Sequence, residues 1–151
     1  MEIGDKIPEE LGTDQNGKAI KASDYTGKKL ALYFYPKDNT PGCTAQACSL
    51  RDGYTALQGA GYEVVGVSID APASHQKFID KFSLPFPLIA DTEKKLVETF
   101  GVWQEKKNYG KTYMGTVRTT FLIDGNGIIR HIIKGGKVNT RNHAAQILDI
   151  Q

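Results

Sequence analysis

The two cysteines of the chain, Cys43 and Cys48, follow a proline-containing loop and could carry nucleophilic or redox chemistry. Thr40 is a good N-cap residue, and Pro41 fits the first helical position, where its missing N–H costs no hydrogen bond. Cys43 then falls at the third helical position, among unpaired amides and the positive end of the helix dipole. We therefore expect Cys43 to be an exposed, reactive thiolate, with the Thr40 hydroxyl one turn back as its hydrogen-bond donor.

The spacing of the two cysteines gives a second indication of redox chemistry. On one α-helix, a separation of five residues places their Cα atoms roughly 8 to 9 Å apart. A disulfide tolerates at most about 7 Å between Cα atoms, so a bond between Cys43 and Cys48 requires the helix to unwind locally. A pair that bonds only after local unfolding suits a catalytic cycle better than a structural cross-link.

The elements around this segment alternate between strands and helices. Residues 30–35 form an apolar run that ends at Pro36, as a buried strand ends at a residue without an N–H donor. The cysteine helix is expected to end near residues 59–61, before a second buried strand at 62–69 and a helix at 74–82. This order favours a mainly parallel sheet covered by helices.

The rest of the chain adds smaller elements to this core. Asn16-Gly17 predicts a small N-terminal hairpin, and Asp124-Gly125-Asn126-Gly127 predicts an antiparallel pair. The pattern also predicts a short strand within residues 84–89, a helix from residue 91 or 92 to 101, strands at 117–123 and 128–133, and a closing helix at 140–148. We expect one α/β domain over residues 1–151, with a central mixed sheet flanked by helices and an N-terminal hairpin extension.

Two motifs resemble those of a known family. Pro36-x-x-x-Thr40-x-x-Cys43 resembles the peroxiredoxin signature. Cys43-x-x-x-x-Cys48-x-x-Arg51-Asp52 is similar to the peroxiredoxin Q branch, also called bacterioferritin comigratory protein, and the likeness continues at residues 113–115 and 118–124. The resemblance implies a thioredoxin-like fold and a thiol-dependent peroxidase with an antioxidant role.

The resemblance also implies roles for the site residues. Cys43 attacks hydrogen peroxide or an organic hydroperoxide and becomes a sulfenic acid, while its own amide, the Thr40 hydroxyl and Arg118 stabilise the departing oxygen. Cys48 is the implied resolving thiol, which closes a disulfide that thioredoxin or a similar dithiol reduces. The branch is often monomeric, and we expect no cofactor.

Other residues near the motif have a structural and a functional interpretation. Pro36 either shields the sulfur or only ends the strand, and Pro41 and Gly42 allow close backbone approach. Arg51 could add positive potential to the pocket or pair with Asp52, and the salt bridge is the favoured interpretation. Cys48 could be a small residue of the helix core instead of the resolving thiol. The aromatic residues Trp103, Tyr109, Tyr113 and Phe121 could wall the site, although core packing is the default interpretation.

Composition excludes several other classes. The 151 residues carry 19 Lys and Arg against 17 Asp and Glu, a net charge of +2 without a basic patch, so no nucleic acid partner is expected. The chain starts without an apolar signal segment and has no membrane-length apolar stretch, which favours a cytoplasmic protein. His75, His131 and His143 are not spaced with the cysteines as zinc ligands would be, so no metal site is expected.

Three alternative functions remain open at this stage. A thioredoxin-type disulfide oxidoreductase normally has Cys-x-x-Cys, which this chain lacks. A non-catalytic binding module with oxidisable cysteines would show an ordinary, unreactive Cys43. A cysteine hydrolase needs a histidine beside the sulfur, which the sequence alone does not test.

Overall fold

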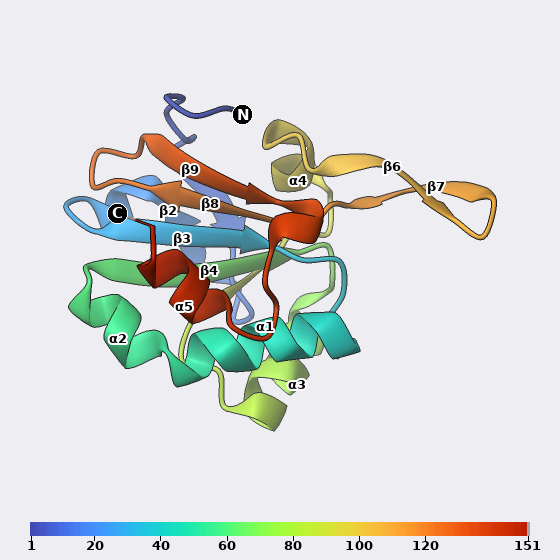
Figure 1. Ribbon diagram of the computed structural model, residues 1–151, viewed down its shortest axis with the longest axis horizontal. Helices are drawn as coiled ribbons and strands as arrows, with labels where there is room; N and C mark the ends of the chain where they lie inside the picture. The colour runs from blue at the N-terminus through green and yellow to red at the C-terminus, as the bar shows by residue number, and fades with distance from the viewer. Residues whose placement is uncertain (151) are drawn as a thin grey trace.

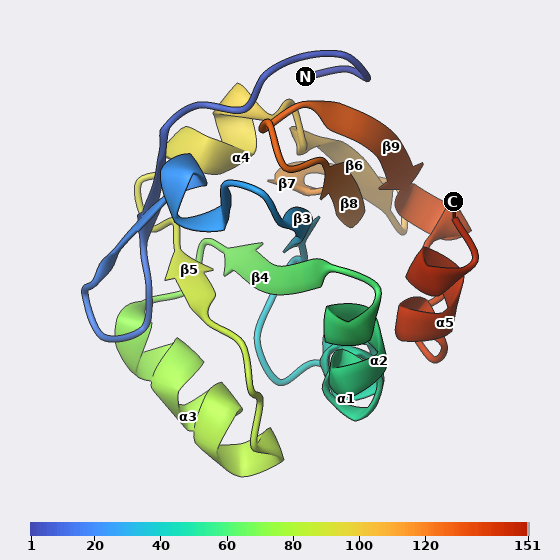
Figure 2. The ribbon, with the colours of Figure 1, turned by 90° about the vertical axis from the view of Figure 1, so that its left-hand side faces the viewer.

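The computed structural model describes residues 1–150 and is built on a mixed five-stranded sheet in the order β5-β4-β3-β8-β9 (Figures 1 and 2). The central strand β3 runs parallel to β4, which runs parallel to β5, and antiparallel to β8, which pairs antiparallel with β9. The strands are β3 Lys29–Phe34, β4 Tyr62–Ser68, β5 Leu88–Ala90, β8 Thr119–Ile123 and β9 Ile129–Lys134. The expected α/β class with a central mixed sheet is confirmed.

Alternate side chains of β3 face two separate hydrophobic clusters, because successive residues of a strand point to opposite sides of the sheet. Ala31 and Tyr33 join the cluster beneath α1, α2, α3 and α5, whereas Leu32 and Phe34 join the cluster beneath α4 and the N-terminal segment. The helices are α1 Pro41–Asp52, α2 Tyr54–Gly59, α3 Pro72–Phe82, α4 Lys95–Thr99 and α5 His143–Leu148. Both faces of the sheet are therefore covered.

Two hairpins lie outside the central sheet. The predicted N-terminal hairpin is present as β1 Glu10–Thr13 and β2 Ala19–Lys21, and a 3-10 helix at Ala22–Tyr25 follows it. A second hairpin, β6 Trp103–Asn108 and β7 Lys111–Thr116, projects away from the body of the molecule (Figure 1). We did not predict this second hairpin, because its polar, lysine-rich strands lack a buried face that would give an apolar alternation.

Several helix boundaries differ from those expected. The predicted cysteine helix is interrupted at Gly53, where a Cβ atom would lie only 2.4 Å from the Ala144 Cβ of α5. The fourth helix begins at Lys95 instead of residue 91 or 92, since the Asp91 carboxylate accepts the amides of Leu96 and Val97 from outside the helix. The last helix begins at His143 instead of residue 140. No helix within residues 1–150 is long and apolar enough to cross a membrane.

Candidate active site

Cys43 lies in the first turn of α1, at the end of the sheet where β3 stops. Thr40 is the N-cap residue with extended backbone angles, and Pro41 is the first helical residue, as the sequence predicts. The first i→i−4 hydrogen bond of the helix runs from the Thr44 amide to the Thr40 carbonyl at 2.8 Å. The Cys43 amide therefore precedes the hydrogen-bond ladder and lies at the positive end of the helix.

The register of the sheet brings Arg118 to this helix end. Phe34, the last residue of β3, pairs with Thr119, the first residue of the antiparallel strand β8, so Arg118 lies beside the loop that leads into α1. The Arg118 Nη2 lies 3.4 Å from the Cys43 Sγ. Gly42 leaves the space for this approach, because a Cβ atom there would lie 3.2 Å from the same Nη2. Residues 75 positions apart in the chain thus meet at one sulfur.

The burial of Cys43 corrects one expectation. We expected an exposed sulfur, but only 2% of the residue is accessible to solvent. Cys43 belongs to the hydrophobic cluster that also contains Tyr33, Tyr35 and Ala47. The position of a residue within a helix predicts the amides around it, but it does not reveal which side of the helix packs on the sheet. The Arg118 guanidinium makes the side-chain hydrogen-bond contact described for this buried sulfur.

Thr40 does not make the hydrogen bond that we expected. Its hydroxyl donates to the Lys37 carbonyl at 2.8 Å, within the loop, and not to the Cys43 sulfur. The side chain thereby closes a turn over residues 37–40, a local bond that short hydroxyl side chains commonly make. Pro36 is half-buried at the end of β3, next to this loop.

Cys48 and Arg51 lie further along α1. Cys48 is half-buried, both cysteines are free thiols, and the helix is continuous between them. The Arg51 Nε donates to the Asp52 carboxylate at 2.9 Å, and its Nη1 donates to the Phe82 carbonyl of α3 at 2.8 Å. The favoured interpretation of Arg51 as a partner of Asp52 agrees with these contacts. Its guanidinium ties α1 to α3, and it is Arg118, not Arg51, that contacts the Cys43 sulfur.

Two polar residues at the site were missed by the sequence analysis. The Gln46 Oε1 accepts a hydrogen bond from the Arg118 Nη1 at 2.6 Å, and this fully buried side chain lies one helical turn after Cys43. Its i+3 spacing from Cys43 is the signal that would have identified it. The Tyr33 hydroxyl is buried without a hydrogen-bond partner, and burial, followed by the negative charge of Cys43, raises the pKa of this phenol well above its usual value. Tyr33 therefore stays protonated in the same buried cluster as Cys43.

Lys106 of the projecting hairpin adds a further positive charge near the site. Its Nζ donates to the Thr116 carbonyl at 2.9 Å, two residues before Arg118, and its side chain crosses Gly115. Partial burial and then the charge of Arg118 lower the pKa of Lys106, while the charge of Cys43 raises it. Nothing in the sequence indicated this residue, because its proximity to the site depends on a hairpin that we did not predict.

The described residues contain one cluster of potential metal ligands, formed by Asp38, Asp70 and His75, whose ligand atoms lie within 4.8 Å of one another. Both imidazole nitrogens of His75 are already in hydrogen bonds, to the Asp38 carboxylate and to the Ile89 carbonyl. The Asp70 carboxylate accepts the Asp38 amide and the Ser68 hydroxyl. These contacts describe a hydrogen-bonded structural network.

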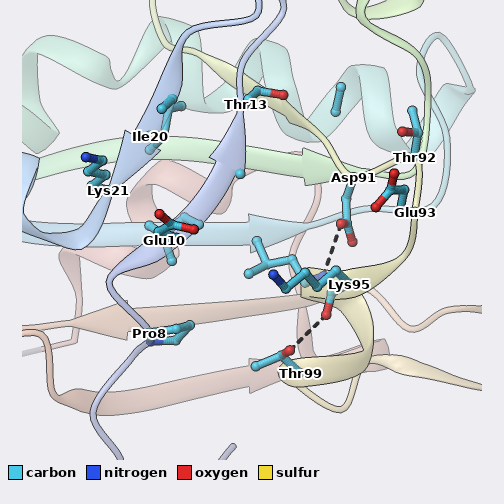
Figure 3. A pocket seen from close by; sticks show the side chains of 15 residues that line it. Pro8, Glu10, Thr13, Ile20, Lys21, Asp91, Thr92, Glu93, Lys95 and Thr99 are labelled. Atoms are coloured by element: carbon cyan, nitrogen blue, oxygen red, sulfur yellow. Dashed lines mark hydrogen bonds between the residues drawn. The ribbon is translucent and has the colours of Figure 1, made fainter.

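A groove lies on another part of the molecule. It has a volume of about 430 Å³ and runs between the N-terminal hairpin and α4 (Figure 3). Its apolar lining, Leu11, Ile20 and Leu96, belongs to the cluster on the other side of the sheet from Cys43. Charged side chains such as Glu10, Lys21 and Lys95 surround it. None of the predicted site residues lines this groove.

The site thus combines three features: a cysteine at the amino end of a helix, a guanidinium in contact with its sulfur, and a second cysteine on the same helix. Together with the thioredoxin-like arrangement of strands and helices, these features define a thiol-dependent oxidoreductase.

Comparisons with known proteins identify the family. Residues 3–132 match the AhpC/TSA family. The chain is 47% identical to peroxiredoxin Bcp of Bacillus subtilis, over 98% of this chain and 93% of that protein. It is 42% identical to peroxiredoxin Bcp of Escherichia coli K12, over 99% and 94%. The chain therefore belongs to the AhpC/TSA family and, within it, to the peroxiredoxin Q, or Bcp, branch.

Solved structures agree with this assignment. The crystal structure of a cysteine mutant of PrxQ from Xylella fastidiosa has a TM-score of 0.88 and 32% identity, and the match covers 99% of this chain and 94% of that chain. The bacterioferritin comigratory protein of Xanthomonas campestris, described for its alkyl peroxide reduction activity, has a TM-score of 0.84 and 32% identity, with 95% of each chain covered. The expected recognition, the thioredoxin-like fold and the thiol peroxidase class are thus confirmed.

Proposed function

We propose that this peroxidase reduces hydrogen peroxide and organic hydroperoxides to water and alcohols through a sulfenic acid on Cys43. The observation that carries the proposal is the 3.4 Å contact between the Arg118 Nη2 and the Cys43 Sγ at the amino end of α1. A fixed guanidinium and a helix amino end both favour a sulfur anion, and the anion is the nucleophilic form of cysteine. The reduction of alkyl peroxides by the Xanthomonas campestris relative supports this class of substrate.

In the first step, the Cys43 thiolate attacks the nearer oxygen of the peroxide. The S–O bond forms as the O–O bond breaks, and the departing oxygen takes up a proton and leaves as water or an alcohol. Negative charge develops on that oxygen, and donors fixed in advance lower the barrier most effectively. Arg118 is such a donor, because the Gln46 carbonyl oxygen holds its second terminal nitrogen at 2.6 Å.

In the second step, we assign Cys48 as the resolving thiol. Its sulfur attacks the Cys43 sulfenic acid, so that a disulfide forms and water is released. Both cysteines lie within the continuous helix α1, whose geometry holds their Cα atoms roughly 8 to 9 Å apart, so the first turns must unwind before the sulfurs meet. The later part of α1 is tied to α3 through Arg51 and to α5 through the Ser49 Oγ, which accepts the Ala144 amide at 3.3 Å.

In the third step, an external dithiol reduces the disulfide. We assign thioredoxin or a similar dithiol protein as this reductant, and a monomeric, single-domain, cytoplasmic enzyme as the working unit. Exchange with a dithiol balances the cycle, because two thiols are regenerated on this chain while one disulfide forms on the reductant. Each turnover then consumes one peroxide and two reducing equivalents.

A coupled assay tests this cycle. Peroxide-dependent oxidation of NADPH is followed in the presence of thioredoxin and thioredoxin reductase, with wild type, Cys43→Ser and Cys48→Ser. We expect steady turnover only in the wild type. If Cys43→Ser sustains NADPH oxidation, the proposal is wrong. If wild type consumes peroxide with a small dithiol but not with thioredoxin, only the reductant assignment fails.

A further inference from the structure

Asp38 is a buried carboxylate in the loop between β3 and α1 that the reaction described above does not use. Only 7% of the residue is accessible, yet its side chain accepts three side-chain hydrogen bonds. The Tyr35 hydroxyl donates to Oδ1 at 2.5 Å, and the Ser74 hydroxyl donates to Oδ2 at 2.8 Å. The His75 Nδ1 lies 2.7 Å from the same Oδ2.

The chemistry of these partners fixes the protonation of the pair. The His75 Nε2 lies 2.9 Å from the Ile89 carbonyl, which can only accept, so Nε2 carries a hydrogen. The short contact between Nδ1 and Oδ2 then needs one further proton, which the two groups share. His75 and Asp38 thus form a fully hydrogen-bonded pair that is neutral overall, as burial requires.

The backbone of Asp38 is held as firmly as its side chain. Its amide donates to the Asp70 carboxylate at 2.8 Å, and the Ser68 hydroxyl donates to the same Asp70 oxygen at 2.7 Å. Asp38 therefore connects the end of β3, the end of β4 and the first turn of α3. It lies two residues before the N-cap Thr40 and five before Cys43.

We propose that Asp38 is a positioning residue for the peroxidase reaction: by holding the loop over residues 36–40 through Tyr35, Ser74 and His75, it sets where α1 begins and thus where the Cys43 sulfur meets Arg118. The proposal deepens the proposed function and rests on it. A loop that is held at its centre cannot slide along the sheet, so the 3.4 Å contact is fixed before the peroxide arrives. A displacement of about 1 Å at a reacting atom costs up to about 100-fold in rate.

Asp38→Ala tests this role, with Asp38→Asn as the conservative variant. Alanine removes every acceptor, whereas asparagine keeps one oxygen and adds an amide that the Tyr35 hydroxyl or the His75 imidazole can accept. In Asp38→Ala, we expect hydrogen peroxide to oxidise Cys43 about 10- to 100-fold more slowly in the first turnover than in wild type. Asp38→Asn should recover most of this loss in rate. Alkylation of Cys43 by iodoacetamide needs the thiolate but no donor to a leaving oxygen, so its rate should fall less than the rate of oxidation by peroxide.

His143→Gln is the matched control. His143 is also a fully buried histidine with both ring nitrogens hydrogen-bonded, to Thr120 and to Gln146, but it lies on α5, outside the loop network. All variants are compared at a temperature where circular dichroism shows each to be folded. His143→Gln should lower the melting temperature and leave the first-turnover rate with peroxide unchanged.

The outcomes separate the two proposals. A wild-type peroxide rate in folded Asp38→Ala, or equal losses in peroxide oxidation and alkylation, would overturn the positioning role. If Asp38→Ala does not fold, Tyr35→Phe and Ser74→Ala each remove one hydrogen bond and should slow peroxide oxidation by about 2- to 10-fold. Unchanged rates in both would also overturn it. Peroxide consumption by Cys43→Ser would instead contradict the proposed function itself.

Discussion

The two cysteines of α1 lie on the same helix but differ in burial and in their polar contacts. Cys43 is in the first turn, buried, and contacted by Arg118, whereas Cys48 is half-buried and lies further along, in the part tied to α3 and α5. The amino end of the helix combines unpaired amides with a guanidinium, and both stabilise an anion. The difference shows that one helix can present a nucleophile at its end while keeping a second thiol one and a half turns away.

The contrast also explains why the two sulfurs are separate in the reduced protein. The side-chain hydrogen bonds described between other elements and the first two turns are those of Arg118 with Cys43 and Gln46. The later turns are held by the Arg51 bond to the Phe82 carbonyl and by the close packing of Gly53 on Ala144. Local unwinding is therefore expected at the Cys43 end, because a helix terminus opens more readily than turns that are tied to two other helices.

Removing the nucleophile gives the largest expected effect. Cys43→Ser should reduce peroxide consumption to the uncatalysed rate, because a serine hydroxyl stays protonated and does not reduce the O–O bond as a thiolate does. Loss of peroxide is followed by a dye-based peroxide assay. Cys48→Ser is the matched control, and it should still consume one equivalent. Equal activity of the two variants would abolish the distinction between the cysteines.

Removing the charge at the Cys43 end should have the next largest effect. Arg118→Met keeps the length of the side chain but removes the donor 3.4 Å from the sulfur, and we expect the first-turnover rate to fall about 100- to 1,000-fold. Stopped-flow measurement of Cys43 oxidation tests this expectation. Arg51→Met serves as the control, because Arg51 binds Asp52 and the Phe82 carbonyl, and its first-turnover rate should not change.

Removing the second thiol should affect recycling and not the first turnover. Cys48→Ser should oxidise Cys43 at the wild-type rate once and then stop, because the sulfenic acid has no partner within the chain. Rapid-quench sampling followed by mass spectrometry separates the two phases. Sustained turnover of this variant with thioredoxin would mean that Cys48 is not the resolving thiol.

A change at the carboxyl end of α1 should affect the stability of the fold more than the rate of the peroxidase reaction. Gly53→Ala places a Cβ atom 2.4 Å from the Ala144 Cβ, so α5 must shift, and we expect a loss of about 1 to 3 kcal/mol in the free energy of unfolding. Urea denaturation measures this loss. The first-turnover rate of the folded variant should remain that of wild type, because Gly53 lies ten residues beyond Cys43.

The last prediction concerns a pH dependence of stability from α5. Burial lowers the pKa of His143 to about 4, while its hydrogen bond to Gln146 partly opposes this shift. The unfolded chain, whose histidine titrates near its usual value of about 6.5, binds the proton first. The contribution of neutral His143 to stability is therefore present above pH 6.5 and is lost as the pH falls from about 6.5 towards 4. Unfolding at several pH values, compared with His143→Gln, tests this loss.

The sequence was informative where local chemistry decides the structure. The N-cap Thr40, the helix start at Pro41 and the hairpin at residues 124–127 all follow from local preferences, and the structure contains each of them. The family motifs led to Arg118 as well, although only the pairing of β3 with β8 explains its position.

The features that we missed depend on tertiary packing. The burial of Cys43, the bond of the Thr40 hydroxyl to Lys37 and the partnership of Gln46 with Arg118 are set by how α1 lies on the sheet. Lys106 reaches the site from a hairpin whose polar strands gave no apolar pattern. Local sequence thus predicted which residues carry the chemistry better than it predicted their surroundings.

The most direct test of the account is to identify the first oxidised sulfur. Reduced wild type and Cys48→Ser each receive one equivalent of hydrogen peroxide with dimedone, which traps sulfenic acid, and their peptides are analysed by mass spectrometry. We predict a dimedone adduct on Cys43 in Cys48→Ser and a Cys43–Cys48 disulfide in wild type. An adduct on Cys48 in wild type, or an unmodified Cys43 in both proteins, would contradict the account.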